Sequence, residues 1–197
     1  MATIDRTAYP RLPINLTRDE IVEWYTPTDD EITFVQRTAR GDSQRLALLL
    51  TLKCVQWMGY FPSLAEVPVV IQHYLCDLLE LPQSLVPAIS TLRTSRRYRQ
   101  AIRAYLGLKP YSQGGQGVVD VAVQQSVATM SDPADLINAA LEQLNNHRFE
   151  LPAFSTLNRR VSHVRHLFHQ DLFRQVDARL SGEQRQKLDG LLLDRTH

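Results

Sequence analysis

The sequence has little that would indicate a secreted, membrane-bound or disulfide-rich protein. Only two of its 197 residues are cysteines, Cys54 and Cys76, and both lie in apolar segments, so we expect reduced core side chains rather than a disulfide. No run reaches the about 18 apolar residues of a transmembrane helix. The N-terminus lacks the apolar core of a signal peptide. These absences predict a cytoplasmic protein without a membrane partner.

Net charge and glycine are also scarce. The formal charge is +1, so any strongly basic segment is a local feature. Ser112–Gly117, with the sequence SQGGQG, is the one glycine-rich stretch, and it lacks the Lys-Ser/Thr ending of a phosphate-binding loop. We expect it to be a linker (residues 112–117) between an N-terminal lobe (residues 1–111) and a C-terminal lobe (residues 118–197).

Catalytic and metal-binding patterns are missing as well. Residues 29–31 are Asp-Asp-Glu, but neighbouring helical residues point about 100° apart and cannot share a metal. We expect them at a helix start, where acids complement the helix dipole. His163, His166 and His169 turn around their helix with no converging acid or cysteine. We therefore expect no metal, no cofactor and no catalytic residue, and a chain that is not an enzyme by itself.

What the sequence does contain is a helical pattern along almost its whole length. Capping boxes begin helices at Thr17 and Thr28, and Leu46–Met58 is apolar nearly all round, which predicts a central buried helix ending at Gly59. Other helices are expected at residues 68–81, 82–92, 95–106, 118–130, 133–147, 156–180 and 181–192. The fold class is all-α, a multi-helix bundle in two lobes with helix-turn-helix-like elements and roughly nine or ten helices.

One basic segment, Ser90–Lys109, departs from the neutral background because it has five arginines, one lysine and no acidic residue. On a helix, one apolar stripe forms at the i, i+3, i+4 and i+7 spacing: Tyr98, Ala101, Ile102 and Tyr105. The opposite face carries Arg96, Arg99, Gln100 and Arg103. Such a helix can pack on a core and offer guanidinium groups to an anion, although an ordinary solvated basic face explains the charge pattern equally well.

A second basic arc is expected on the helix over residues 156–180. Its apolar stripe is Leu157, Val161, Val164, Phe168 and Leu172. Its polar arc contains Arg159, His163, His166, Gln170 and Arg174, with Arg160 beside it. Two basic helices in a chain without a catalytic pattern suggest a nucleic-acid partner, because the arginine fork suits phosphates and guanine edges.

Three stretches also occur in the order expected for a known family. They are WYTPTDDEITFVQRTARGDSQRLALLLTLKCVQWMGYFPSLAEVPVVIQHYL, RTSRRYRQAIRAYLGL and LPAFSTLNRRVSHVR, which lie between Trp24 and Arg165. In this order they resemble the N-terminal region of transposases of the Tn-three family, which move replicative class II transposons.

The resemblance implies a helical region that recognises the terminal inverted repeats of a transposon. Catalysis in that family belongs to a later ribonuclease-H-like domain with three carboxylates and a divalent metal, which this chain is too short to contain. The resemblance therefore implies the DNA-binding portion without the chemistry, either a fragment or a truncated product. It points to five arginines between Arg93 and Arg103 and to Ser155, Thr156, Arg159 and Arg160.

From pattern and resemblance together, the expected partner is the double-stranded DNA of transposon ends. The residues expected to contact it are Arg93, Arg96, Arg97, Arg99, Gln100, Arg103, Lys109, Ser155, Thr156, Arg159, Arg160, His163 and Arg174. The alternative is a helical protein-interaction module that docks on the rest of a transposase or on a second copy, through Trp57–Phe61 and the C-terminal helix.

Overall fold

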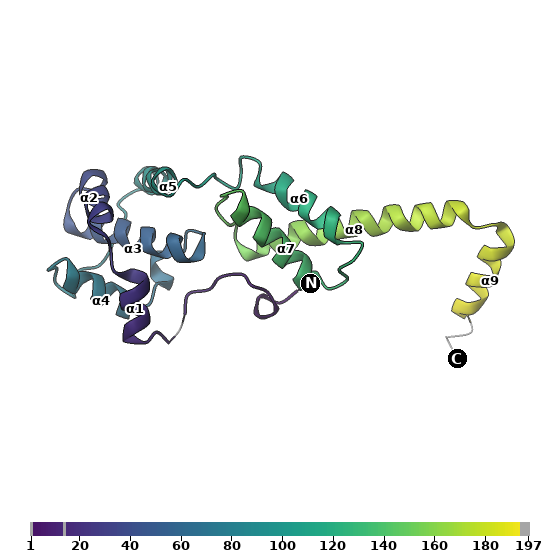
Figure 1. Cartoon of the computed structure of the whole chain (residues 1–197), viewed down its shortest axis with the longest axis horizontal. Coiled ribbons are helices and arrows are strands. Elements are labelled where there is room, and N and C mark those ends of the chain that lie inside the picture. The colour runs from purple at the N-terminus through teal and green to yellow at the C-terminus, as the bar shows by residue number, and fades with distance from the viewer. Residues whose placement is uncertain (1, 14, 194–197) are drawn as a thin grey trace.

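The computed structural model describes residues 2–13 and 15–193, with side chains as far as residue 187. Within this part of the chain all regular elements are helices, which confirms the all-α class (Figure 1). The first helices are α1 (Arg18–Tyr25), α2 (Asp29–Thr38), α3 (Asp42–Met58), α4 (Val69–Leu78) and α5 (Leu92–Leu106). The later ones are α6 (Gly115–Ser126), α7 (Pro133–Asn146), α8 (Phe154–Arg179) and α9 (Gly182–Leu193). Short 3-10 turns, η1 (Ile4–Arg6) and η2 (Leu64–Glu66), complete the list, and no described helix is long and apolar enough to cross a membrane.

The first hydrophobic cluster surrounds α3, as the sequence predicted for its central helix. Residues 46–55 of α3 are all buried, and Gly59 ends the helix with a left-handed φ of 71°. The predicted capping boxes at Thr17 and Thr28 are confirmed and begin α1 and α2. Cys54 and Cys76 are buried free thiols in this cluster, which confirms the expectation of reduced core side chains.

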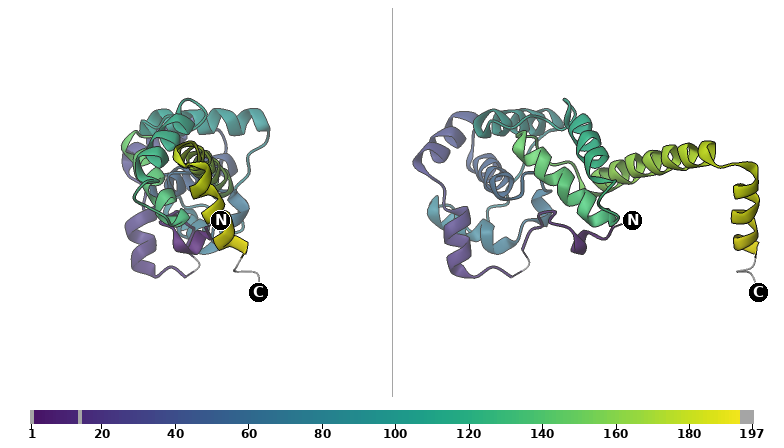
Figure 2. Two further views of the ribbon diagram at one scale, coloured as in Figure 1. Left: turned by 90° about the vertical axis from the view of Figure 1, so that its right-hand side faces the viewer. Right: turned by 45° about the vertical axis from the view of Figure 1, so that its right-hand side comes forward.

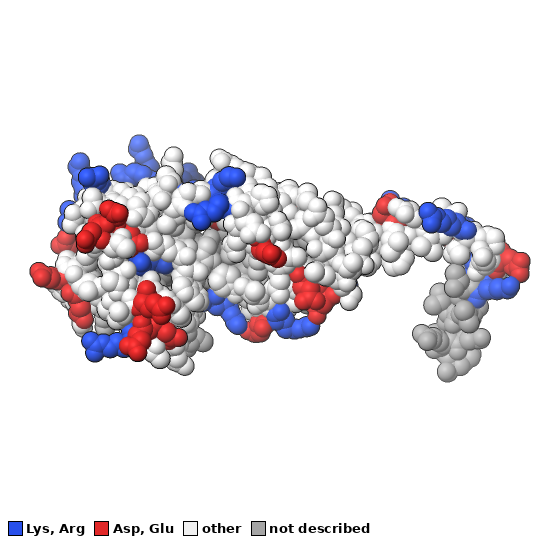
Figure 3. Space-filling view, viewed as in Figure 1, with Lys and Arg blue, Asp and Glu red and all other residues white. Residues whose placement is uncertain are grey.

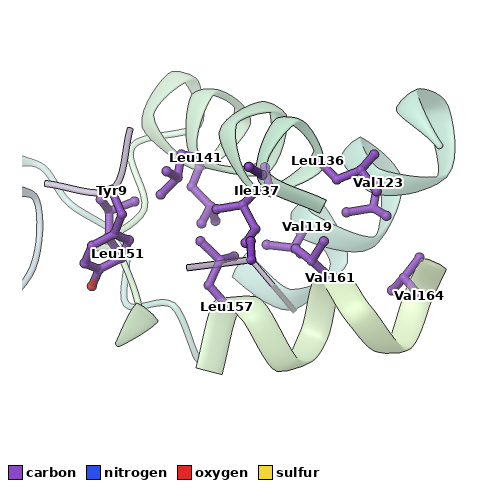
Figure 4. Packing of buried hydrophobic residues seen from close by; sticks show 14 of the residues in the cluster. Tyr9, Val119, Val123, Leu136, Ile137, Leu141, Leu151, Leu157, Val161 and Val164 are labelled. Atoms are coloured by element: carbon purple, nitrogen blue, oxygen red, sulfur yellow. The ribbon is translucent and has the colours of Figure 1, made fainter. Parts of the chain in front are cut away.

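A second hydrophobic cluster is built from α6, α7 and α8 (Figure 4). Asp132 caps α7 by accepting from the Ala134 amide, as predicted. The first residues of the chain cross over to this cluster, where the Tyr9 hydroxyl donates to the Pro152 carbonyl at 2.8 Å. Residues 115–117 lie in the first turn of α6 rather than in a loop. The boundary between two lobes stays a prediction.

The helix predicted over residues 82–92 is absent, and α5 begins earlier than predicted. Residues 79–91 form turns and extended backbone, because Pro82 and Pro87 disfavour helix before and within this stretch. Distant side chains also take its carbonyls: Ser43 donates to Val86 at 2.6 Å. Thr91 then caps α5 by accepting from the Thr94 amide at 3.1 Å. The helix therefore starts at Leu92, directly after this cap and before the predicted start at residue 95.

The long helix α8 leaves the body of the molecule in its second half. Figures 1 and 2 show this half projecting alone, with α9 turning away at its end. The predicted apolar stripe is therefore buried only at Leu157, Val161 and Val164, while Leu172 is 42% exposed. Periodicity marked the apolar face correctly but could not show where the covering helices end.

Two glycines in the first turn of α6 give a matched test of this packing. A Cβ built on Gly115 would lie 2.5 Å from Cδ2 of the buried Tyr111 ring, whereas a Cβ on Gly117 meets nothing within 4 Å. We expect Gly115→Ala to lower the free energy of unfolding by about 1–3 kcal/mol through overpacking. Gly117→Ala should raise it by about 0.4–1 kcal/mol, because alanine restricts the unfolded chain. Urea unfolding measures both, and equal effects of the two substitutions would contradict the packing described.

Candidate nucleic-acid interface

The helix α5 packs on the first cluster through one side only. Tyr98 and Ile102 are buried, and the Tyr98 hydroxyl donates to Gln44 Oε1 at 3.2 Å. Tyr105 was expected on the same buried side, but it is 39% exposed and stacks on Phe34 with ring centroids 4.5 Å apart. The anchored side of α5 fixes the direction in which its other side chains project.

The outer side of α5 is a row of exposed polar side chains: Arg93, Arg96, Arg97, Arg99 and Gln100. Among the described residues, none of these four arginines forms an ion pair with a carboxylate. Figure 3 shows Lys and Arg atoms gathered along the edge over α5, while Asp and Glu atoms lie mainly below, towards α1. We call this row the arginine face.

An aromatic ring supports one end of the arginine face. The guanidinium carbons of Arg99 and Arg103 lie 5.1 and 5.3 Å from the centroid of the Phe61 ring. Arginine above an aromatic face gains cation–π attraction of about 0.5–1 kcal/mol at exposed sites. Phe61 therefore restrains Arg99 while leaving its nitrogen atoms free to donate outward.

Arg103 was predicted on the same exposed face as Arg96 and Arg99. It is less exposed than they are, so this part of the prediction was wrong. Its Nε donates to Glu150 Oε2 at 2.8 Å, and both side chains are more than three-quarters buried. The other carboxylate oxygen of Glu150 accepts from the Tyr111 amide at 3.3 Å. Arg103 therefore ties α5 to the segment that precedes α8.

Further bonds fix the end of α5 to this same segment. Arg148 donates from its side chain to the Leu106 carbonyl at 2.6 Å. The Lys109 amide donates to the Arg148 carbonyl at 2.7 Å, and the Glu150 amide donates to the Lys109 carbonyl at 2.8 Å. We call the contacts of Arg103, Lys109, Arg148 and Glu150 the α5 latch. Sequence reasoning missed Arg148 and Glu150, since no local motif marks either.

The second predicted group lies in the first turns of α8. Thr156, Arg159, Arg160 and His163 line a cleft of about 320 Å³ together with Tyr111 and Gln116. Arg160 donates from Nε to Asp120 Oδ1 at 2.6 Å and from a terminal nitrogen to Oδ2. This hydrogen bonding to Asp120 raises the pKa of Arg160. We call this the α8 cleft.

The two groups border one groove. A larger cleft of about 610 Å³ is lined by Arg99 and Phe61 on one side and by Ser112 and Thr156 on the other. It shares Tyr111 and Thr156 with the α8 cleft, so the two clefts adjoin each other. The fold thus brings Arg99 of the arginine face and the start of α8 to the same groove, although more than 40 residues separate α5 from α8 in sequence.

The remaining predicted residues are placed less uniformly. Ser155 is exposed in the first turn of α8, and Lys109 is exposed with its ammonium 5.4 Å from the Phe149 ring centroid. Arg174 is exposed on the second half of α8 and lines neither cleft. Among the described residues, no group of three or more His, Cys, Asp or Glu side chains could hold a metal ion.

Comparison of the sequence with known proteins identifies a matching family and relatives of this chain. The profile of a domain of unknown function, DUF4158, matches residues 1–164. The chain is 27% identical to the transposase for transposon Tn501 of Pseudomonas aeruginosa over 183 residues, which are 89% of this chain and 18% of that protein. It is 22% identical to the transposase for transposon Tn1546 of Enterococcus faecium over 191 residues, 95% of this chain and 19% of that protein.

The chain thus spans about a fifth of the length of the curated relatives it matches. The match nevertheless covers both hydrophobic clusters, the arginine face and the α8 cleft. The chain therefore belongs to the DUF4158 family and, as the sequence resemblance predicted, is related to the N-terminal region of transposases of the Tn-three family.

Proposed function

We propose that this chain is the DNA-binding portion of a transposase and that it recognises the terminal inverted repeats of a transposon. It performs no catalysis itself and acts on DNA in the cytoplasm, with the remainder of the transposase as its second partner. The observation that carries the proposal is the arginine face: its four arginines have no carboxylate partner in the described chain, and one of them, Arg99, lines the groove that leads to α8.

The geometry of α5 suits the major groove of DNA. The helix is 15 residues long and held from behind by Tyr98 and Ile102, so its outer side can approach a duplex without leaving the core exposed. Arginine forks can bond guanine edges in pairs, and Gln100 can bond adenine in the same way. The other arginines can neutralise phosphates, which supply most of the affinity of protein–DNA complexes.

Selection of duplexes from a random library tests this proposal. We expect the chain to enrich one sequence, and we expect its affinity for that duplex to fall steeply with salt, by a slope of about 0.9 in log–log units per phosphate contact. The enriched sequence should match inverted repeats in the DNA that flanks the gene. If no sequence is enriched and binding is weak and insensitive to salt, the proposal is wrong.

A second candidate function is a protein-interaction module, and the projecting half of α8 favours it. Leu167, Leu172, Phe173 and Val176 are each more than 40% exposed there. The segment around Trp57 supports it less, because Trp57 packs against Trp24 with ring centroids 4.9 Å apart and the rings tilted by 33°. Sedimentation without DNA separates the two functions, since a tight dimer indifferent to DNA would favour this one.

A further inference from the structure

The α8 cleft differs in shape from the arginine face. The cleft is concave, with a volume of about 320 Å³, whereas the arginine face is the exposed outer side of a helix. Base edges in a duplex are reached by groups that protrude into its grooves. A phosphate group stands out from the duplex and can enter a small concave site. The shape of the α8 cleft therefore suits the DNA backbone better than a base.

The arginines of the α8 cleft also favour a phosphate. Arg159 is exposed and has no carboxylate partner among the described residues. Arg160 donates from Nε and one terminal nitrogen to Asp120, which also neutralises its charge, so Arg159 is the unpaired cation of the two. The three remaining N–H groups of Arg160 lie on its two terminal nitrogens and can still donate to a phosphate oxygen.

Two further features at this site lack a partner within the protein. Tyr111 is 9% exposed, and its hydroxyl has no hydrogen-bond partner in the described chain. Burial raises the pKa of Tyr111. Ala153 at the N-cap of α8 lines the adjoining larger cleft and provides no capping side chain, so the helix dipole favours an anion beside the α8 cleft. Tyr111 lines the cleft, but its hydroxyl is closed off from solvent, so Arg159 is the group that can reach a phosphate.

We propose that the α8 cleft is a subsite for one phosphate of the DNA backbone, contacted by Arg159, and that α5 reads the sequence. Asp120 is then a positioning residue, which holds the Arg160 guanidinium through Nε and one terminal nitrogen. The inference rests on the proposed DNA-binding function and assigns the two basic groups different roles within it.

Titrations of two labelled duplexes test this division, one carrying the sequence enriched by selection and one scrambled. Arg159→Gln should weaken both by the same factor, about 3- to 10-fold near 0.1 M salt, and should make the salt slope shallower by about 0.9. Gln100→Ala should weaken the enriched duplex alone. Arg179→Gln removes the same charge from the exposed end of α8 and should change neither affinity more than about twofold, as expected for a charge about 30 Å along the helix from Arg159.

The outcomes separate this inference from the function on which it rests. If the unmodified chain binds neither duplex, the proposed function fails and the inference with it. If it binds both, but Arg159→Gln acts like Arg179→Gln or weakens only the enriched duplex, the phosphate subsite alone is wrong. Inorganic phosphate at matched ionic strength is the third probe. If inorganic phosphate binds only when Arg159 is present, and Arg159→Gln leaves the affinity for both duplexes unchanged, the cleft is a site for free anions. That result would overturn its assignment to DNA.

Discussion

Replacing Arg96 and Arg99 together by glutamine should weaken binding of the enriched duplex by at least about 30-fold. Each arginine that contacts a base contributes about 1–3 kcal/mol, so the pair should cost about 2–6 kcal/mol. Both side chains are exposed on α5 and have no carboxylate partner among the described residues, so removing their charge leaves no acid unpaired. Fluorescence anisotropy of the labelled duplex measures the loss.

The matched control is the double substitution Arg18→Gln and Arg179→Gln. It removes the same charge from two exposed sites, the start of α1 and the end of α8, that do not line the groove. We expect the control to lose less than about threefold, since exposed charges beyond a Debye length of about 10 Å are largely screened. Both double variants should unfold at nearly the same temperature as the unmodified chain. Equal losses of affinity in the two would mean that net charge, and not the arginine face, determines binding.

Lys53→Met should cause the largest loss of stability, about 3–5 kcal/mol of the free energy of unfolding. Lys53 donates to Glu31 Oε2 at 3.2 Å, and both side chains are more than nine-tenths buried between α2 and α3. Glu31 also accepts from the Thr28 amide at 2.9 Å and from Gln56. Lys53→Met would leave the buried Glu31 carboxylate without its cation. Removing one partner of a buried ion pair lowers stability strongly, because the remaining charge stays buried and unpaired. Urea unfolding measures the change.

The double variant Glu31→Gln and Lys53→Met tests that reason. With both charges removed, the free energy of unfolding should recover by at least about 2 kcal/mol relative to Lys53→Met alone. The side-chain carbonyl of the introduced glutamine could still accept from the Thr28 amide, so the cap of α2 would be retained. Additive losses from the two substitutions would show that the pair is not coupled in the folded protein.

Local signals in the sequence predicted the helices well where a side chain acts on its own helix end. The boxes at Thr17, Thr28 and Ser181 and the stop at Gly59 are all present in the structure. Predictions failed where a distant residue decides the local conformation. The segment over residues 82–91 resembles a helix start, but its carbonyls are taken by side chains of α3 and α4, as when Gln72 donates to Leu85 at 2.9 Å.

In the candidate site, too, features set by neighbouring residues could be predicted and contacts between distant residues could not. The arginine face was predictable because the helical period sorts Tyr98 and Ile102 away from the arginines. The partners of Arg103 and Arg160 were not, since Glu150 lies 47 residues and Asp120 lies 40 residues away in the sequence. Charge pattern alone cannot distinguish an arginine that holds the protein together from one that is free for a ligand.

The latch explains why the two basic groups can act as one surface. Arg103, Arg148 and Glu150 join the end of α5 to the segment before α8 through side-chain and backbone bonds. A surface assembled in advance loses less conformational entropy on binding than one that must be ordered by the ligand. In the proposed interface, the charge excess of residues 90–109 is therefore only one half, and the start of α8 is the other.

Hydrogen–deuterium exchange with and without the enriched duplex tests most directly whether this surface binds DNA. We predict that the duplex slows exchange in α5, Leu92–Leu106, and in the first turns of α8, while α1 and α2 exchange as before. Protection confined to the projecting half of α8, or no protection in α5 at duplex concentrations that saturate binding, would contradict the proposed interface.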